Sequence, residues 1–190
     1  MNVETAQANY NISLHDIHTR MGGKARGASG KLFETLTENL CESVGFVAKK
    51  NDYKRSKEVK GRTLTNLQVD RHIYNTKGVM FAAVECKAYI DSSMLKRAFM
   101  DFVSLSESPD VSKDCNFAIV AGQIAVSQET LGYYQSLFEQ ETGKCINTFI
   151  LNATKNRREY RPIYERYCVS DFSLDSDEVK RFVNFLENKG

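Results

Sequence analysis

The stretch VMFAAVECK (Val79–Lys87) decides the expected fold. Its first six residues are wholly apolar, which is typical of a strand that is buried on both faces of a sheet. The stretch ends on two charged residues, Glu85 and Lys87, whose burial carries a desolvation cost. Because side chains alternate along a strand, Glu85 and Lys87 share one face while Cys86 points to the other. A buried strand that ends in this way points to a functional site.

A second predicted strand, residues 67–74, lies just upstream and carries Asp70. Residues 75–78 (Asn-Thr-Lys-Gly) have the chemistry of a hairpin turn that joins the two strands. A turn centred on the middle of this segment places Asp70 opposite Ala83 and diagonally beside Glu85, on the same face. Diagonal neighbours have Cα atoms about 7–8 Å apart, so the two carboxylates can converge on one ion. A slip of one residue would move Asp70 to the other face.

Hydrophobic periodicity and turn residues predict the other elements. They are a helix over Lys31–Val44 stopped by Gly45, a strand over Phe46–Ala48, a helix over Met94–Val103, a strand over Phe117–Ala121, a helix from about Ser127 to Glu141, a strand over Ile146–Leu151, and a C-terminal helix capped by Asp175 or Ser176. No element is predicted in the polar residues 1–30. The order predicts one α/β domain over residues 1–190, with a central mixed β-sheet flanked by helices.

Composition favours an ordinary soluble protein. Of 190 residues, 42% are hydrophobic and 26% are charged, which is close to the globular average. The net charge of +2 does not by itself indicate a nucleic-acid partner. No apolar run approaches the ~20 residues that span a bilayer, and the N-terminus shows no basic-then-apolar signal. We therefore expect a cytoplasmic protein with no membrane partner.

Three other familiar sites are not expected. The five cysteines are scattered without a C-x-x-C pair, which argues against a disulfide framework or a zinc site. His15 and His18 are expected at the surface. The glycine-rich segment Met21–Lys31 is not a phosphate loop, because Ala25 and Leu32 stand where that motif needs Gly and Ser or Thr. No nucleotide cofactor is therefore expected.

Asp70, followed fifteen residues later by Glu85-Cys86-Lys87, resembles the signature of the PD-(D/E)XK, restriction-endonuclease-like nuclease superfamily. The (D/E)-x-K pattern is degenerate and occurs five times in the chain. The other four are Asp52-Tyr53-Lys54, Glu58-Val59-Lys60, Glu178-Val179-Lys180 and Glu187-Asn188-Lys189. Among the five, only Glu85-Cys86-Lys87 ends an apolar strand with a carboxylate on the strand before it.

The order of elements over about residues 30–125 is similar to the αβββαβ core of that superfamily. The first helix of that core often supplies a glutamate, in a setting similar to that of Glu34. On a helical wheel Glu34 lies beside the apolar arc and Glu38 lies opposite its centre. The proline that often precedes the first aspartate is Val69 here. Residues 1–29 and 126–190 have no counterpart and are expected to serve DNA recognition and dimerisation.

This resemblance implies a Mg²⁺-dependent endonuclease of double-stranded DNA, most like a type II restriction enzyme, with Mn²⁺ as a substitute ion. Asp70, Glu85 and the backbone carbonyl of Cys86 would bind the metal, together with Glu34 directly or through water. Lys87 would orient or deprotonate the attacking water and contact the phosphate. A homodimer would cut at a short specific sequence and leave a 5′-phosphate and a 3′-hydroxyl.

Basic segments suit contacts with phosphate. The residues predicted to bind DNA are Lys49, Lys50, Lys54, Arg55, Lys57, Lys60 and Arg62 in one segment, Lys155, Arg157, Arg158 and Arg161 in another, and Lys24 and Arg26 ahead of the first predicted helix. An isolated charge run is more simply explained as a solvated face. Paired with a nuclease site, phosphate contact is the better interpretation.

Four alternatives remain open. The same superfamily includes structure-specific and repair nucleases such as junction resolvases, which would prefer branched DNA. A non-catalytic DNA-binding domain would bind DNA without hydrolysing it. An α/β domain that assembles with proteins would show no salt-dependent binding to DNA. At the residue level, Glu85 and Lys87 would then form a structural ion pair at a strand end, with Asp70 exposed beside it.

Overall fold

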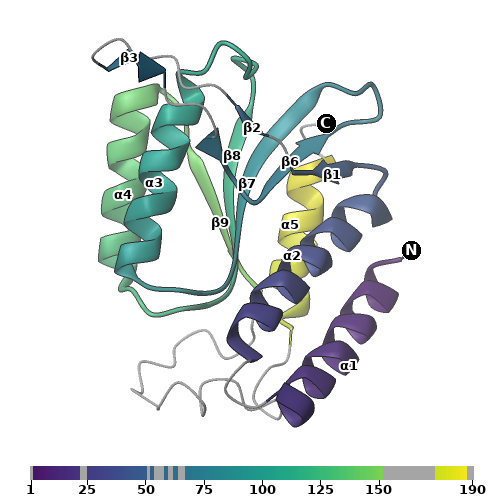
Figure 1. The fold of residues 1–190 in the computed structure, drawn as a ribbon. Coiled ribbons are helices and arrows are strands. Elements are labelled where there is room, and N and C mark those ends of the chain that lie inside the picture. The colour runs from purple at the N-terminus through teal and green to yellow at the C-terminus, as the bar shows by residue number, and fades with distance from the viewer. Residues whose placement is uncertain are drawn as a thin grey trace.

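The computed structural model describes residues 2–21, 25–50, 52–53, 58–59, 62–63, 67–151 and 174–187, and its architecture is mixed α/β (Figure 1). A five-stranded sheet is flanked by helices on both faces, which confirms the expected class. The helices are α1 (Val3–Met21), α2 (Ala25–Ser43), α3 (Ser92–Ser106), α4 (Gln128–Thr142) and α5 (Ser176–Glu187). The strands are β1 (Val47–Lys49), β2 (Asp52–Tyr53), β3 (Glu58–Val59), β4 (Arg62–Thr63), β5 (Leu67–Gln68), β6 (Arg71–Tyr74), β7 (Met80–Ile90), β8 (Asn116–Ile124) and β9 (Ile146–Ile150).

The five strands follow the order β1-β6-β7-β8-β9 across the sheet. β1, β6 and β7 are antiparallel neighbours, whereas β7, β8 and β9 run parallel. Parallel neighbours need crossover connections, which α3 and α4 supply. The helix, three-stranded meander, helix and strand expected over about residues 30–125 are thus present as α2, β1, β6, β7, α3 and β8. Two short ribbons, β2 with β5 and β3 with β4, are inserted between β1 and β6.

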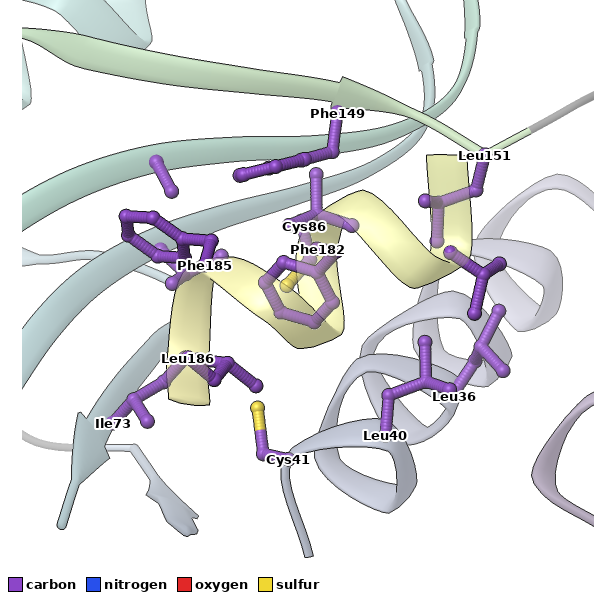
Figure 2. Packing of buried hydrophobic residues seen from close by; sticks show 14 of the residues in the cluster. Leu36, Leu40, Cys41, Ile73, Cys86, Phe149, Leu151, Phe182, Phe185 and Leu186 are labelled. Carbon is purple, nitrogen blue, oxygen red and sulfur yellow. The ribbon is translucent and has the colours of Figure 1, made fainter. Parts of the chain in front are cut away.

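Two buried clusters attach the helices to the two faces of the sheet. On one face the rings of Phe102 in α3 and Phe138 in α4 lie 5.3 and 5.2 Å from the ring of Phe117 in β8. On the other face Phe182 of α5 packs edge-on against Phe149 of β9, with ring centroids 5.2 Å apart. Figure 2 shows side chains of α2 and α5 meeting in this second cluster. The apolar part of β7 is buried because helices cover both of its faces.

The N-terminal part of the chain corrects the sequence-based prediction. α1 lies outside α2, where the ring of Tyr10 packs edge-on against Phe33 at 5.9 Å. Polar and small residues dominate α1, so its hydrophobic periodicity is too weak to predict a helix. α2 begins at Ala25 rather than Lys31, and Arg26 therefore lies inside this helix instead of ahead of it. In the part of the chain that the structure describes, no helix combines the length and apolar character that crossing a bilayer requires.

Helix ends follow the predicted turn residues. Gly45 has a φ of 85°, and its amide donates to the carbonyl of Glu42. The amide of Phe46 donates to the carbonyl of Cys41, which completes a Schellman turn after α2. At the start of α5, the side chain of Asp175 accepts the amides of the first turn, so Asp175 rather than its neighbour is the cap.

The register of the hairpin between β6 and β7 differs from the predicted register by two residues, because His72 rather than Asp70 lies opposite Ala83. The loop takes in one residue more than expected, Val79, and a bulge at Phe81 adds another. Since side chains alternate with a period of two, the two shifts cancel past the bulge, so Ile73 shares a face with Ala82 and Val84 as expected, whereas Met80 lies on the other face. The strand expected over residues 67–74 is broken at Asp70, which lies in a bend just before β6 and outside the ladder, so alternation does not set the direction of its side chain.

Candidate functional site

Two carboxylates and one ammonium group meet where the start of β6 approaches β7. The Nζ atom of Lys87 lies 2.6 Å from Oδ2 of Asp70 and 2.6 Å from Oε1 of Glu85. The Asp70 and Lys87 side chains are 19% and 22% exposed, whereas that of Glu85 is 4% exposed. Solvent therefore reaches this Asp70–Glu85–Lys87 cluster at both Asp70 and Lys87, and Glu85 forms its buried end.

The end of the β6–β7 ladder creates the cluster. The last pair in the ladder on this side joins Arg71 to Val84. Beyond it, the amide of Cys86 donates to Oδ2 of Asp70 at 2.9 Å instead of to another strand. The same oxygen accepts a hydrogen bond from Lys87. The Asp70 carboxylate thus accepts the hydrogen bond that a residue of a neighbouring strand would otherwise accept, and it also binds Lys87.

The electrostatics of the cluster follow from burial and close charges. Burial is the largest cause of the raised pKa of Glu85, and the charge of Asp70 adds to it while Lys87 opposes it. Asp101 on α3 makes a smaller contribution in the same direction as Asp70. For Lys87, burial acts to lower the pKa, but the two carboxylates and their hydrogen bonds outweigh it, so the pKa is raised. Lys87 is therefore a protonated, fixed positive charge at neutral pH.

Arg71 organises a second group of charges next to the cluster. Its Nε lies 2.5 Å from Oε1 of Glu38, and its Nη1 lies 2.7 Å from Oε2 of Glu34. Nη1 also donates to the backbone carbonyl of Asp70 at 2.5 Å. Burial acts to lower the pKa of Arg71, but Glu38 and Glu34 outweigh it and the pKa is raised. In the structure Glu34 is thus joined to the cluster through Arg71.

The two groups of charges lie on opposite faces of the sheet. Val84 and Cys86 belong to the buried cluster beneath α2 and α5, whereas Ala83 belongs to the one beneath α3 and α4. Alternation therefore directs Glu85 and Lys87 toward the α3 side. The thiol of Cys86 points into the packing beneath α5 (Figure 2), so this residue contributes only its backbone to the cluster.

The donor atoms of the cluster fit a hard divalent cation. Mg²⁺ prefers carboxylate and carbonyl oxygens and keeps several waters. Asp70 and Glu85 supply two carboxylates that repel one another, and a cation between them relieves this repulsion. Both backbone groups of a strand residue face the same neighbour, so the carbonyl of Cys86 points toward the same side as its amide. Within the described ranges, no group of three or more His, Cys, Asp or Glu side chains is arranged to hold a metal. A metal here would rely on two carboxylates, backbone and water.

Among the residues predicted to bind DNA, Lys49 and Lys50 are described, and both are exposed at the end of β1. The Nζ of Lys49 lies 5.6 Å from the centre of the Tyr74 ring. The backbones of Arg26 and Arg62 lie in α2 and β4, but their side chains fall outside the description. The other predicted contacts lie outside the described residues: Lys24, Lys54, Arg55, Lys57, Lys60, Lys155, Arg157, Arg158 and Arg161.

Sequence reasoning missed three charged residues around the cluster: Arg71, Glu38 and Asp101. A signal for Glu38 and Arg71 was present, because Glu34 and Glu38 are four residues apart on a helix and can share one basic partner. The helical wheel places Glu38 away from the apolar arc, yet the long side chain of Arg71 reaches out to it from the sheet. For Asp101 the spacing on α3 carried no such signal.

No protein-family model matches this chain. A curated protein, the type II restriction enzyme DdeI of Desulfomicrobium norvegicum, is 30% identical to it over an aligned region that covers 49% of this chain and 50% of that enzyme. The chain thus spans about half the length of the curated relative it matches. It is distantly related, over that half, to a type II restriction enzyme.

Proposed function

We propose that this protein is a Mg²⁺-dependent endonuclease that hydrolyses phosphodiester bonds of double-stranded DNA. The observation that carries the proposal is the Asp70–Glu85–Lys87 cluster, in which one lysine bridges two carboxylates at the end of a buried strand pair. Similarity to a type II restriction enzyme over half the chain supports the same class. Cleavage at a specific sequence, by a homodimer that leaves 5′-phosphate and 3′-hydroxyl ends, is part of the proposal.

In this proposal Asp70 and Glu85 hold the Mg²⁺ ion, with the carbonyl of Cys86 as a further ligand. Glu34 does not contact the ion in this proposal, since its described ion pair is with Arg71 and it lies across the sheet from Glu85. Bound Mg²⁺ supplies Lewis-acid activation of water and neutralises charge on the phosphate. Asp70 is the more exposed of the two carboxylates, so in this proposal DNA approaches the ion from the side of Asp70.

Lys87 has the role of a cation in the reaction. Its raised pKa keeps the ammonium protonated, which favours orienting water and binding the phosphate over removing a proton. Both of its described ion pairs are with carboxylates of the cluster, so its position is set before DNA binds. A preorganised positive charge at this place stabilises the negative charge that develops on phosphate.

The test is incubation of the purified protein with plasmid and phage DNA, with Mg²⁺, with Mn²⁺ and with a chelator. Discrete fragments that require the metal would support a sequence-specific endonuclease. Ligation of the fragments without further treatment would support 5′-phosphate and 3′-hydroxyl ends. Preference for branched DNA would support a junction-type nuclease instead.

Two results would contradict the proposal. One is binding of DNA without hydrolysis in any divalent metal, together with unchanged binding by Glu85→Ala, which describes a non-catalytic DNA-binding domain. The other is the absence of salt-dependent DNA binding, which describes a protein-assembly domain. If the protein cleaves DNA and Asp70→Ala retains full activity, the enzyme class stands and the site is elsewhere.

A further inference from the structure

Arg71 is a buried basic residue that joins α2 to the start of β6. It is 7% exposed, and its guanidinium contacts three oxygen acceptors from separate places. Two are the carboxylates of Glu34 and Glu38 on α2, and the third is the backbone carbonyl of Asp70. The planar guanidinium fork of an arginine suits several acceptors at fixed angles, which an ammonium group does not match.

Asp70 needs such support because the strand ladder does not hold it. It lies in a bend immediately before β6, and backbone pairing to β7 starts one residue later. Its carboxylate is held by the amide of Cys86 and by Lys87, on the β7 side. Its carbonyl is held by Arg71, on the α2 side. The position of the proposed metal-binding carboxylate is therefore set jointly by β7 and by α2.

We propose that Arg71 is a positioning residue, whose guanidinium is fixed by Glu34 and Glu38 and in turn fixes the backbone of Asp70 for the reaction. The inference rests on the proposed function of the Asp70–Glu85–Lys87 cluster. Under this inference α2 takes part in the site through Arg71, although Glu34 and Glu38 lie across the sheet from Glu85. Glu34 and Glu38 act in this scheme chiefly by holding Arg71.

A neutral replacement separates positioning from folding. Removing Arg71 alone leaves two carboxylates without their partner, and this is strongly destabilising at a partly buried place. The triple variant Arg71→Met, Glu34→Gln, Glu38→Gln removes all three charges together. It keeps side chains of similar length between α2 and β6, so the fold loses the guanidinium without acquiring unpaired charge.

The experiment compares this triple variant and Arg71→Lys with the wild type. It measures kcat and KM for DNA, the Mg²⁺ concentration for half-maximal cleavage, and the rise in unfolding temperature that Mg²⁺ causes in the absence of DNA. We expect the triple variant to remain folded while its apparent Mg²⁺ affinity and kcat fall roughly 10- to 100-fold, as is usual for groups that orient metal ligands. KM should change little, and Arg71→Lys should recover only part of the loss. Arg181→Met is the control, since it removes an ion pair on α5 away from the cluster and should leave kcat unchanged.

A folded triple variant with the kcat and Mg²⁺ dependence of the wild type would overturn the role of Arg71 and leave the proposed function intact. A wild type that neither cleaves DNA nor is stabilised by Mg²⁺ would overturn the proposed function and this inference with it. If the triple variant does not fold, Glu38→Gln replaces it in the same assays. A severalfold loss of Mg²⁺ affinity would then support the inference, and no change would overturn it.

Discussion

Lys87 stands in two roles at once, as a counter-ion to two carboxylates and as the proposed partner of the phosphate. In the first role it competes with any cation for Asp70 and Glu85. In the second it is needed only when DNA is bound. The first role weakens metal binding, whereas the second promotes cleavage. One substitution of Lys87 therefore separates the two roles.

We therefore predict that Lys87→Met binds Mg²⁺ more tightly than the wild type and yet cleaves DNA about 100-fold more slowly or worse. Without metal the variant should be less stable, because the two carboxylates lose their shared positive charge. The measurements are Mg²⁺ titrations followed by thermal unfolding, and cleavage rates at saturating Mg²⁺. Lys180→Met is the control, since that lysine belongs to another (D/E)-x-K pattern and is 74% exposed. Cleavage by Lys87→Met at the wild-type rate would contradict its role.

Cys86 is predicted to act through its backbone alone. Its thiol is buried beneath α5, and burial is the main reason that its pKa is raised well above the usual value. Cys86→Ala should cost about 1 kcal/mol of stability through the small cavity it leaves, and cleavage should persist. Urea unfolding and cleavage assays measure the two effects. A folded variant without activity would show that the thiol takes part.

At the level of elements, α5 closes one edge of the sheet. β9 is the last strand of the sheet among the residues that the structure describes, and Oε2 of Glu178 accepts the amide of Ile150 at 3.1 Å. Arg181 donates to the carbonyl of Thr148, and its guanidinium lies 4.6 Å from the centre of the Phe149 ring. Side chains of α5 thus satisfy backbone groups that an exposed edge would offer to another chain.

Glu178→Ala should destabilise the protein by about 1–3 kcal/mol, because the Ile150 amide loses its acceptor. Lys180→Ala, on the same helix, should change stability by no more than about 0.5 kcal/mol. Both free energies of unfolding are measured in urea, with cleavage at low temperature as a second readout that should stay unchanged. Equal stability of the two variants would show that the contact to β9 contributes nothing.

The elements that the sequence predicted best are those with strong local signals. The apolar run of β7 and the turn at Gly45 specify their own structure, since burial and a positive φ leave few alternatives. The predicted register of the β6–β7 hairpin was wrong, because the longer loop and the bulge at Phe81 depend on packing that no local pattern encodes. α1 was missed for a similar reason, since Tyr10 is buried only when Phe33 is already in place.

For the site, period-two alternation was enough to bring Glu85 and Lys87 to one face, whereas Asp70 reaches them from a bend just beyond the end of the ladder. Arg71 was not predicted, because its contacts join residues 33 and 37 positions away in the chain, Glu38 and Glu34. Whether Glu34 and Glu38 reach Arg71 depends on how α2 crosses the sheet. The sequence pattern alone therefore identified the residues proposed for chemistry and missed the one proposed to position them.

For the whole molecule, charge distribution matters more than total charge. A net charge of +2 gives little long-range attraction for DNA, so the proposed DNA binding has to come from local basic groups. Lys49→Ala and Lys50→Ala should each weaken binding to DNA of any sequence. Each should also reduce the magnitude of the slope of log affinity against log salt concentration by about 1. Binding isotherms at several salt concentrations measure this slope. An unchanged slope would remove the end of β1 from the DNA interface.

The most direct test of the proposed catalytic site is a comparison of Glu85→Gln with Glu187→Gln in single-turnover cleavage of plasmid DNA. Both variants keep the shape of a glutamate in a (D/E)-x-K pattern and remove one negative charge. Only Glu85 is buried against Lys87, whereas Glu187 is exposed at the end of α5. We expect Glu85→Gln to fold, to bind DNA and to cleave about 100-fold more slowly or worse in Mg²⁺, while Glu187→Gln cleaves like the wild type. Cleavage by Glu85→Gln at the wild-type rate would contradict the assignment of the site.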